Sequence, residues 1–429
     1  SSAPNVVEHR CQKGARQMKS LDFGRYALGS CVAIAILTAC GGSQPPIGAP
    51  GVMQLQVAHH ERAGPDSGVE FAYVTNDGSN NIFTYTINLT SGALKQVKGS
   101  PFGAGTEPLD LAVDPTGRFA YVTNDYPYDV YGYRINAASG ALTQMNESPF
   151  GAGIGALGVA VAPNGKFVFT ANLGYGFSSE PGNVSAYRID ARSGALTQVE
   201  GSPFWADDGP YEVAVDPTGK FAYVINWESN DICAYRIDVR SGGLTQVTGS
   251  PFATGIYPDG LAVAPTGKFV FVANNSSGNV SAYRIDAVSG ALTQVKGSPF
   301  ETGTYPWDVA VDPTGRFVYV ANNGSSNVSA YAIDAVSGAL KPVKGSPFAA
   351  GSSPLDVAVD PMAKFAYVTN NGGVRSGYGN ISAYIINATS GALTQVKGSP
   401  FAAGTNPYAI AICRVNAGRC SAAAATPPR

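Results

Sequence analysis

Large apolar and small or polar side chains alternate in short runs along most of the chain. The run Phe71-Ala-Tyr-Val-Thr-Asn76 is typical, because its large side chains fall at every second position. A period of two predicts half-buried β-strands. No segment keeps apolar side chains at the 3.6-residue period of an amphipathic helix. The pattern therefore predicts an all-β protein.

Four kinds of run recur in a fixed order and form one repeated unit. Runs like Phe71–Asn76 come first, followed by runs like Asn279–Ile285, by Ala291–Val295 with Ser-Pro-Phe after it, and by Asp308–Val311. The unit returns every 48 residues, and once after 54. Such a period indicates a repeat architecture. The seven units open at Phe71, Phe119, Phe167, Phe221, Phe269, Phe317 and Phe365.

Seven units of four antiparallel strands predict a seven-bladed β-propeller, since closing a ring of sheets leaves no exposed end blade. The first unit lacks an inner strand in front of it. The run Pro407–Ile412 matches the inner strand of another unit, Pro306–Val311. We therefore expect Pro407–Ile412 to pair with Phe71–Asn76 and close the ring.

The N-terminal segment has the features of a bacterial targeting signal. Lys19 and Arg25 precede the apolar run Ala27–Ile36, and Leu37-Thr-Ala-Cys40 resembles the lipobox of bacterial lipoproteins. The alternative is an ordinary cleavage site with an incidental cysteine. Lipidation of Cys40 would anchor the protein in the bacterial cell envelope, on the periplasmic face or at the cell surface.

The expected domain organisation follows from these features. Residues 1–40 are an upstream extension and lipoprotein signal peptide, and residues 41–66 are a flexible tether rich in Pro and Gly. Residues 67–415 form the propeller, and residues 416–429 form a C-terminal tail. Cys413 and Cys420 are close enough in sequence to close a short disulfide loop or to remain reduced.

Charge and composition exclude some partners. The chain has 28 basic and 30 acidic residues, so its net charge of −2 gives no reason to expect nucleic acid as a partner. No haem-attachment motif and no obvious quinone or metal ligand set is present, so no cofactor is expected. Apart from the membrane reached through the lipid anchor, we expect a monomer whose ligand is a neutral glycan, another small molecule or a protein.

Several short sequence motifs resemble those of the YVTN-type propellers. Tyr73–Asn76, Tyr121–Asn124 and Tyr367–Asn370 each read Tyr-Val-Thr-Asn, and Ser-Gly-Ala-Leu and Gly-Ser-Pro-Phe recur between them. These propellers are similar to the bacterial seven-bladed lactonase family, which includes 6-phosphogluconolactonases. The resemblance implies the same fold and, as one alternative, hydrolysis of a sugar lactone. Relatives with this chemistry are expected to use His, Arg and carboxylates near the channel mouth.

The repeats contain no histidine, because His9, His59 and His60 all precede them. Hydrolysis needs a positioned acid or base. If the protein is an enzyme, a carboxylate could take that role, and Glu212 and Asp308 are the candidates.

The residues that differ from one unit to the next lie mainly on one face of the predicted propeller. Strand alternation places the loops before the inner strands and after the Tyr-Val-Thr-Asn strands on the same face. These loops hold all three tryptophans, many carboxylates and a single cation, Arg375. The candidate ligand-binding residues there are Trp205, Tyr211, Glu212, Trp227, Tyr257, Asp259, Tyr305, Trp307, Asp308 and Arg375.

An acidic, aromatic mouth disfavours anionic ligands, which need Arg or Lys. It favours a neutral glycan, a cationic ligand, a metal ion held by oxygen atoms, or a protein surface. Alternatively, the aromatic side chains only pack loop against loop. A binding module at the cell envelope is the first functional hypothesis, and a sugar-lactone hydrolase is the alternative.

One repeat position carries an acid in four of the seven units. Two explanations stay open: the carboxylates bond amide groups of a turn, or they form an incomplete acidic ring around the channel mouth. The seven residues at this position are Asp110, Gly158, Glu212, Gly260, Asp308, Asp356 and Ala409.

Overall fold

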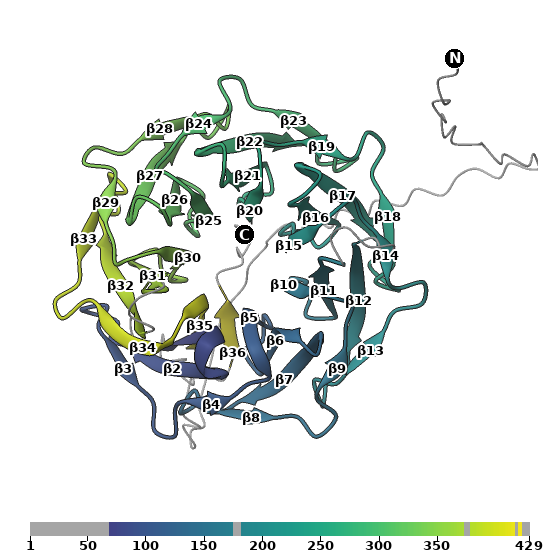
Figure 1. Cartoon of the computed structure of the whole chain (residues 1–429), viewed down its shortest axis with the longest axis horizontal. Helices are drawn as coiled ribbons and strands as arrows, with labels where there is room; N and C mark the ends of the chain where they lie inside the picture. The colour runs from purple at the N-terminus through teal and green to yellow at the C-terminus, as the bar shows by residue number, and fades with distance from the viewer. Residues whose placement is uncertain (1–67, 175–181, 373–377, 417–418, 423–429) are drawn as a thin grey trace, which may run out of the picture. The chain divides into compact units, whose positions relative to one another are not determined.

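The computed structural model describes residues 68–174, 182–372, 378–416 and 419–422, and these form seven antiparallel sheets around a central axis (Figure 1). The predicted seven-bladed all-β propeller is confirmed. The predicted signal peptide, the lipidation site Cys40 and the tether lie outside the described residues and stay predictions. No helix in the described part is long and apolar enough to cross a membrane.

Each blade has four main strands and a short fifth one. We number the blades from the N-terminus, so that blade 1 contains β1. The inner strands are β35 (Pro407–Asn416), β5 (Thr106–Val113), β10 (Ala156–Val161), β15 (Pro210–Val215), β20 (Pro258–Val263), β25 (Pro306–Val311) and β30 (Pro354–Val359). The second strands are β1 (Val69–Asn76), β6 (Phe119–Tyr126), β11 (Phe167–Asn172), β16 (Phe221–Asn226), β21 (Phe269–Asn274), β26 (Phe317–Asn322) and β31 (Phe365–Asn370).

The outer strands follow in the same order. The third strands are β2 (Asn81–Ile87), β7 (Asp129–Ile135), β12 (Asn183–Ile189), β17 (Asp231–Ile237), β22 (Asn279–Ile285), β27 (Asn327–Ile333) and β32 (Tyr378–Ile386). The fourth strands are β3 (Leu94–Gln96), β8 (Leu142–Gln144), β13 (Leu196–Gln198), β18 (Leu244–Gln246), β23 (Leu292–Gln294), β28 (Leu340–Pro342) and β33 (Leu393–Gln395). A single 3₁₀ turn, η1 (Asp77–Ser79), follows β1.

The phenylalanine of each Ser-Pro-Phe word begins a fifth strand, which pairs with the third strand of its blade. The serine of the same word accepts a hydrogen bond from that third strand, as Ser298 Oγ does from Ala282 N at 2.9 Å. The Ser-Pro-Phe motif therefore satisfies the hydrogen-bonding groups of the backbone at the outer edge of the blade. The fifth strands are β4 (Phe102–Gly103), β9 (Phe150–Gly151), β14 (Phe204–Trp205), β19 (Phe252–Ala253), β24 (Phe300–Glu301), β29 (Phe348–Ala349) and β34 (Phe401–Thr405).

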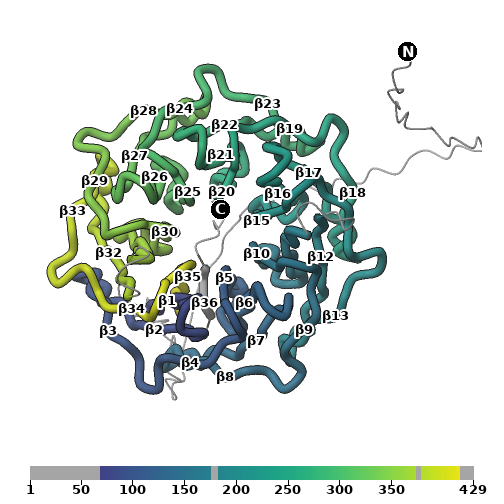
Figure 2. Tube along the Cα trace, viewed as in Figure 1, coloured from purple at the N-terminus to yellow at the C-terminus, as the bar shows by residue number. Residues whose placement is uncertain are grey.

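The two ends of the propeller close the ring in blade 1, where purple β1 and yellow β35 lie side by side (Figure 2). The strands are antiparallel and place Ala72 opposite Ile412, which confirms the predicted closure. Beyond β35, the segment predicted as a tail contains β36 (Arg419–Ala422), paired with β35. Cys413 is disulfide-bonded, and the side chain of its predicted partner Cys420 lies outside the described side chains.

The hydrophobic core lies between blades. Phe221 and Tyr223 of blade 4 pack with Leu261 and Val270 of blade 5 in one buried cluster. Gly290 of blade 5 lies so close to Phe221 that a Cβ there would be 2.3 Å from the ring, and Gly290 also has a left-handed φ of 81°. The Tyr223 hydroxyl donates a hydrogen bond to the Gly290 carbonyl at 3.1 Å. The repeated Phe, Tyr and Ser-Gly words are therefore the contact between one blade and the next.

Candidate functional site

Every inner strand is bulged at the same place, near the mouth of the central channel. In blade 4, Pro210 pairs with Asn226 and Glu212 pairs with Ile225, so Tyr211 is the extra residue. A bulge breaks the strict alternation of a strand and redirects a side chain. Tyr211 and Glu212 therefore both line the central cavity, although they are consecutive.

The bulges create two layers of residues at the mouth. The first layer holds the residue before the acidic repeat position, and the second holds that position itself. The first layer is Leu109, Leu157, Tyr211, Asp259, Trp307, Leu355 and Tyr408. The second-layer residues that line the cavity are Asp110, Gly158, Glu212, Asp308, Asp356 and Ala409.

The cavity inside these layers has a volume of about 260 Å³. This volume lies just below the usual range of pockets for drug-sized ligands, so the cavity suits a molecule of about one sugar ring. No lysine or arginine is among the described residues that line it. Within the described part of the chain, no group of three or more His, Cys, Asp and Glu side chains could hold a metal ion.

The four second-layer acids accept hydrogen bonds from backbone amides of the following blade. Asp110 accepts from Val159 N at 2.7 Å, and Glu212 accepts from Leu261 N at 2.7 Å. Asp308 and Asp356 accept in the same way from Val357 N at 3.2 Å and from Ile410 N at 2.6 Å. The carboxylates therefore do accept hydrogen bonds from backbone amides. These amides belong to the next inner strand and not to a turn.

The glycines at this position have a packing reason. A Cβ on Gly158 would lie 2.7 Å from the Glu212 Cα, and a Cβ on Gly260 would lie 2.5 Å from the Asp308 Cα. Real Cβ atoms do not approach backbone this closely. At these two of the three places without an acid, neighbouring inner strands leave no room for a side chain.

Burial raises the pKa of each second-layer acid. Burial, opposed by two backbone hydrogen bonds, raises the pKa of Asp110 to about 6. Burial and the charges of Asp308 and Asp110 raise the pKa of Glu212 well above its ordinary value. Asp356 is hydrogen-bonded to Asp308, and its pKa is raised by burial and by the Asp308 charge. The charge of one carboxyl group therefore makes ionisation of the other less favourable.

Hydroxyl and indole groups of the first layer are also linked. The hydroxyls of Tyr211 and Tyr408 lie 2.8 Å apart, and the Trp307 side chain is hydrogen-bonded to Tyr408. Asp259 is hydrogen-bonded to the side chains of Trp227 and Asn275, and burial raises the pKa of Asp259 to about 7. The wall of the cavity therefore presents both hydroxyl groups and carboxyl groups to a ligand.

The buried acids predict that the propeller is more stable at pH 5 than at pH 8. A carboxyl group with a raised pKa binds a proton on folding, so its contribution is complete below about pH 4 and is lost as the pH rises through its folded pKa. Asp259 is 5% exposed, and its contribution to stability is lost by about pH 7. Urea unfolding of Asp259→Asn should show the pH 5 to pH 8 difference reduced by about 2 kcal/mol.

The control for this prediction is Asp208→Asn, because Asp208 is an exposed acid on the same face. An equal pH dependence in wild type and Asp259→Asn would show that Asp259 is not protonated in the fold.

A family model matches most of the propeller. The model of the lactonase family, described as a 7-bladed β-propeller, matches residues 49–253, 201–302 and 260–352. These matches together cover more than half of the 429 residues. The chain belongs to this family. The resemblance carried by the Tyr-Val-Thr-Asn words is thereby confirmed.

Solved structures of similar proteins include lactonases by name. A proposed 6-phosphogluconolactonase of Bacteroides fragilis is 20% identical, with a TM-score of 0.68 over 82% of this chain and 99% of that chain. One from Bacteroides uniformis is 19% identical, with a TM-score of 0.66 over 81% and 100%. The periplasmic gluconolactonase of Pseudomonas aeruginosa is 18% identical, with a TM-score of 0.67 over 81% and 99%. At these identities the likeness shows the fold alone.

None of the curated proteins compared with this lactonase-family propeller matches it in sequence.

The structure brings half of the predicted ligand-binding residues into one cavity. Tyr211, Glu212, Asp259, Trp307 and Asp308 line it. Trp227 and Tyr257 stack on each other beside Asp259. Trp205 and Tyr305 are 54% and 56% exposed and are not among the lining residues. Arg375 lies outside the described residues.

The list of candidates omitted three lining residues that carry a carboxyl or hydroxyl group. Asp110 and Asp356 occupy the same repeat position as Glu212 and Asp308, and Tyr408 occupies the position of Tyr211. The alignment of the seven units already names Asp110 and Asp356, and the same alignment finds Tyr408. No pattern in the sequence predicts the hydrogen bond between Asp308 and Asp356, because it depends on how adjacent blades are spaced.

Proposed function

We propose that this lactonase-family propeller binds an uncharged, hydroxyl-rich lactone in its central cavity and hydrolyses it with the Asp308–Asp356 pair. The observation that carries the proposal is the hydrogen-bonded carboxyl pair in the cavity wall. Such a pair holds one acid and one base side by side. Family membership and a cavity of about one sugar ring support the same substrate class.

The absence of lysine and arginine from the described lining favours an unphosphorylated lactone. A phosphate group would have to enter a cavity lined by Asp110, Glu212, Asp308 and Asp356 without a compensating cation. Phosphate recognition ordinarily uses Arg or Lys. This argument separates the proposed substrate from the phosphorylated one named for the two Bacteroides relatives.

The chemistry assigns a separate role to each acid of the pair. Asp308, as the carboxylate, accepts a proton from water while the water oxygen forms a bond to the lactone carbonyl carbon. Asp356, as the acid, gives its proton to the ring oxygen as the carbon–oxygen bond breaks. The product is an open-chain hydroxy acid. Once that product ionises, the remaining carboxylates of the cavity repel it, which favours its release.

A second candidate, a binding module without catalysis, is favoured by one specific observation. All four second-layer acids already bond the backbone of the next blade. Their number and placement are thus explained by blade packing even without a reaction. In this case the cavity binds a neutral sugar and releases it unchanged.

The test compares hydrolysis by the wild type, Asp308→Asn and Asp356→Asn. Glucono-1,5-lactone and its 6-phosphate are the substrates, with spontaneous hydrolysis subtracted. Asparagine keeps an oxygen for the backbone hydrogen bond but does not transfer protons at neutral pH. We expect kcat for the neutral lactone to fall about 100-fold in each variant, and the wild type to prefer the neutral lactone.

Asp110→Asn is the matched variant, because Asp110 has the same interblade hydrogen bond but is not hydrogen-bonded to a second acid. A loss in Asp308→Asn no greater than in Asp110→Asn would refute the role of the pair. Sugar binding without any turnover in the wild type would establish the binding module instead.

A further inference from the structure

Two aromatic rings from neighbouring blades stack beside the cavity. Trp227 follows β16 of blade 4, and Tyr257 precedes β20 of blade 5. Their ring centroids are 4.2 Å apart and their planes differ by 15°. Tyr257 is 38% exposed, so the stacked pair remains accessible to solvent. We call Trp227 and Tyr257 the aromatic platform.

The platform is joined to the cavity by Asp259. The Trp227 side chain is hydrogen-bonded to Asp259, which lines the cavity. Only Pro258 separates Asp259 from Tyr257 in the chain. A ligand group that leaves the cavity on this side therefore meets the platform.

Tyr257 is held in a backbone conformation that its side chain disfavours. Its φ is 53°, in the left-handed region, where bulky residues are rare. Asn230 Oδ1 accepts a hydrogen bond from Tyr257 N at 2.7 Å, and Asn275 N donates to the Tyr257 carbonyl at 2.8 Å. The loop is thus fixed from both sides before any ligand arrives.

The other blades show that this position does not require an aromatic residue. All seven copies have a positive φ here, and two of them are glycine, which adopts it without strain. The backbone conformation therefore does not explain why residue 257 is a tyrosine, since Ser353 and Asn406 adopt it in other blades. The seven residues are Glu107, Gly155, Gly209, Tyr257, Tyr305, Ser353 and Asn406.

We propose that the aromatic platform binds a second sugar ring, joined to the ring in the cavity, so that the ligand is a neutral disaccharide or longer glycan whose end is the lactone. This inference rests on the proposed function only for the lactone at that end. The cavity of about 260 Å³ has room for about one ring, so a larger ligand must continue outside it.

The chemistry of the platform selects a sugar. The C–H groups of a pyranose face carry a small positive charge and pack on the electron-rich face of an aromatic ring. The hydroxyl groups at the edge of the same pyranose can donate to Asp259. An anionic glycan is disfavoured by the carboxyl groups of Asp259 and of the second layer.

The experiment measures the affinity of unreactive sugars by calorimetry, with glucose, cellobiose, maltose and gentiobiose as probes. In the wild type we expect at least one disaccharide to bind about tenfold more tightly than glucose. Tyr257→Gly should reduce this preference to near unity while the melting temperature stays equal or rises, since glycine relieves the left-handed strain. Tyr257→Phe keeps the ring and should keep the preference.

Tyr305→Gly is the matched control, because Tyr305 has the same conformation in the next blade, with a φ of 50°, but lies outside the platform and the cavity lining. The inference is overturned if no disaccharide binds more tightly than glucose, or if Tyr257→Gly retains the preference. A lower melting temperature in Tyr257→Gly with the preference intact would identify Tyr257 as loop packing. Disaccharide preference without turnover of any lactone would uphold the platform and reject hydrolysis.

Discussion

A chain that ends at Thr405 should lose its cooperative unfolding transition. The deletion removes β35, which pairs with β1 along almost its whole length. It also removes Ile410 and Ile412 from the buried cluster that they share with Val74 and Tyr367. Because each blade is stabilised only by its two neighbours, an open ring exposes apolar faces on both sides of the break.

The expected result is a broad or absent transition in calorimetry and soluble aggregates in size-exclusion chromatography. Exposed strand edges such as that of β1 pair with other chains. A chain ending at Ala422 keeps β35 and β36 and is the control, with a transition like that of the full chain. A sharp transition at the wild-type temperature after deletion of residues 406–429 would mean that β35 does not hold the ring together.

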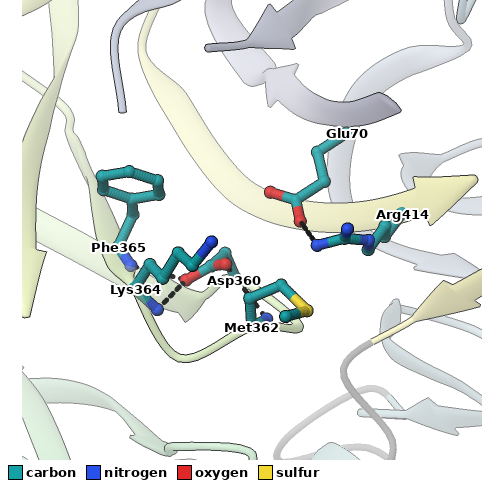
Figure 3. A network of polar contacts seen from close by, with 6 residues as sticks. All are labelled: Glu70, Asp360, Met362, Lys364, Phe365 and Arg414. Carbon is teal, nitrogen blue, oxygen red and sulfur yellow. Dashed lines mark hydrogen bonds and ion pairs between the residues drawn. The ribbon is translucent and has the colours of Figure 1, made fainter. Parts of the chain in front are cut away.

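Replacing Arg414 by Met should lower the free energy of unfolding by about 3–5 kcal/mol. Arg414 on β35 and Glu70 on β1 form an ion pair at 3.1 Å across the closing strands, and both side chains are buried (Figure 3). Removing the guanidinium leaves Glu70 buried near the Asp360 carboxylate, which already helps to raise the Glu70 pKa. The loss is therefore the cost of an uncompensated buried acid.

The loss should depend on pH in a defined direction. Burial raises the pKa of Glu70 to about 7 even with Arg414 present. Without Arg414 the carboxyl is protonated at still higher pH, so its charge costs little at pH 5 and most at pH 8. Urea unfolding at the two pH values measures this difference.

The double variant Glu70→Met with Arg414→Met is the matched control. Two apolar side chains of similar length often replace a buried ion pair with little loss. We expect the double variant to recover most of the stability lost by Arg414→Met alone. Equal losses in both variants would assign the effect to packing of the Arg414 stem and not to the charge.

The fold of this protein follows from its amino-acid sequence alone. Strand periodicity and the return of one unit every 48 residues can both be read without coordinates. The closure followed as well, because Pro407–Ile412 matches an inner strand that the first unit lacks. The strand predictions succeeded because they depend on neighbours in the chain, and the closure prediction succeeded because each blade repeats the same strands.

The composition of the mouth was only partly visible in the sequence. Strand alternation placed Tyr211, Trp307 and Asp308 at the correct end of the channel, where they line the cavity. It could not show that two consecutive residues of one strand both face the channel. That outcome comes from a bulge, whose position depends on the partner strand.

The interactions that give the mouth its chemistry depend on how the blades pack against one another. Glu212 bonds Leu261 of the next blade, Asp356 is hydrogen-bonded to Asp308, and Trp227 stacks on Tyr257. Each pair joins residues from different blades, tens of residues apart in the chain. Their contact depends on the spacing between blades, which is a property of the closed ring and not of any one repeat.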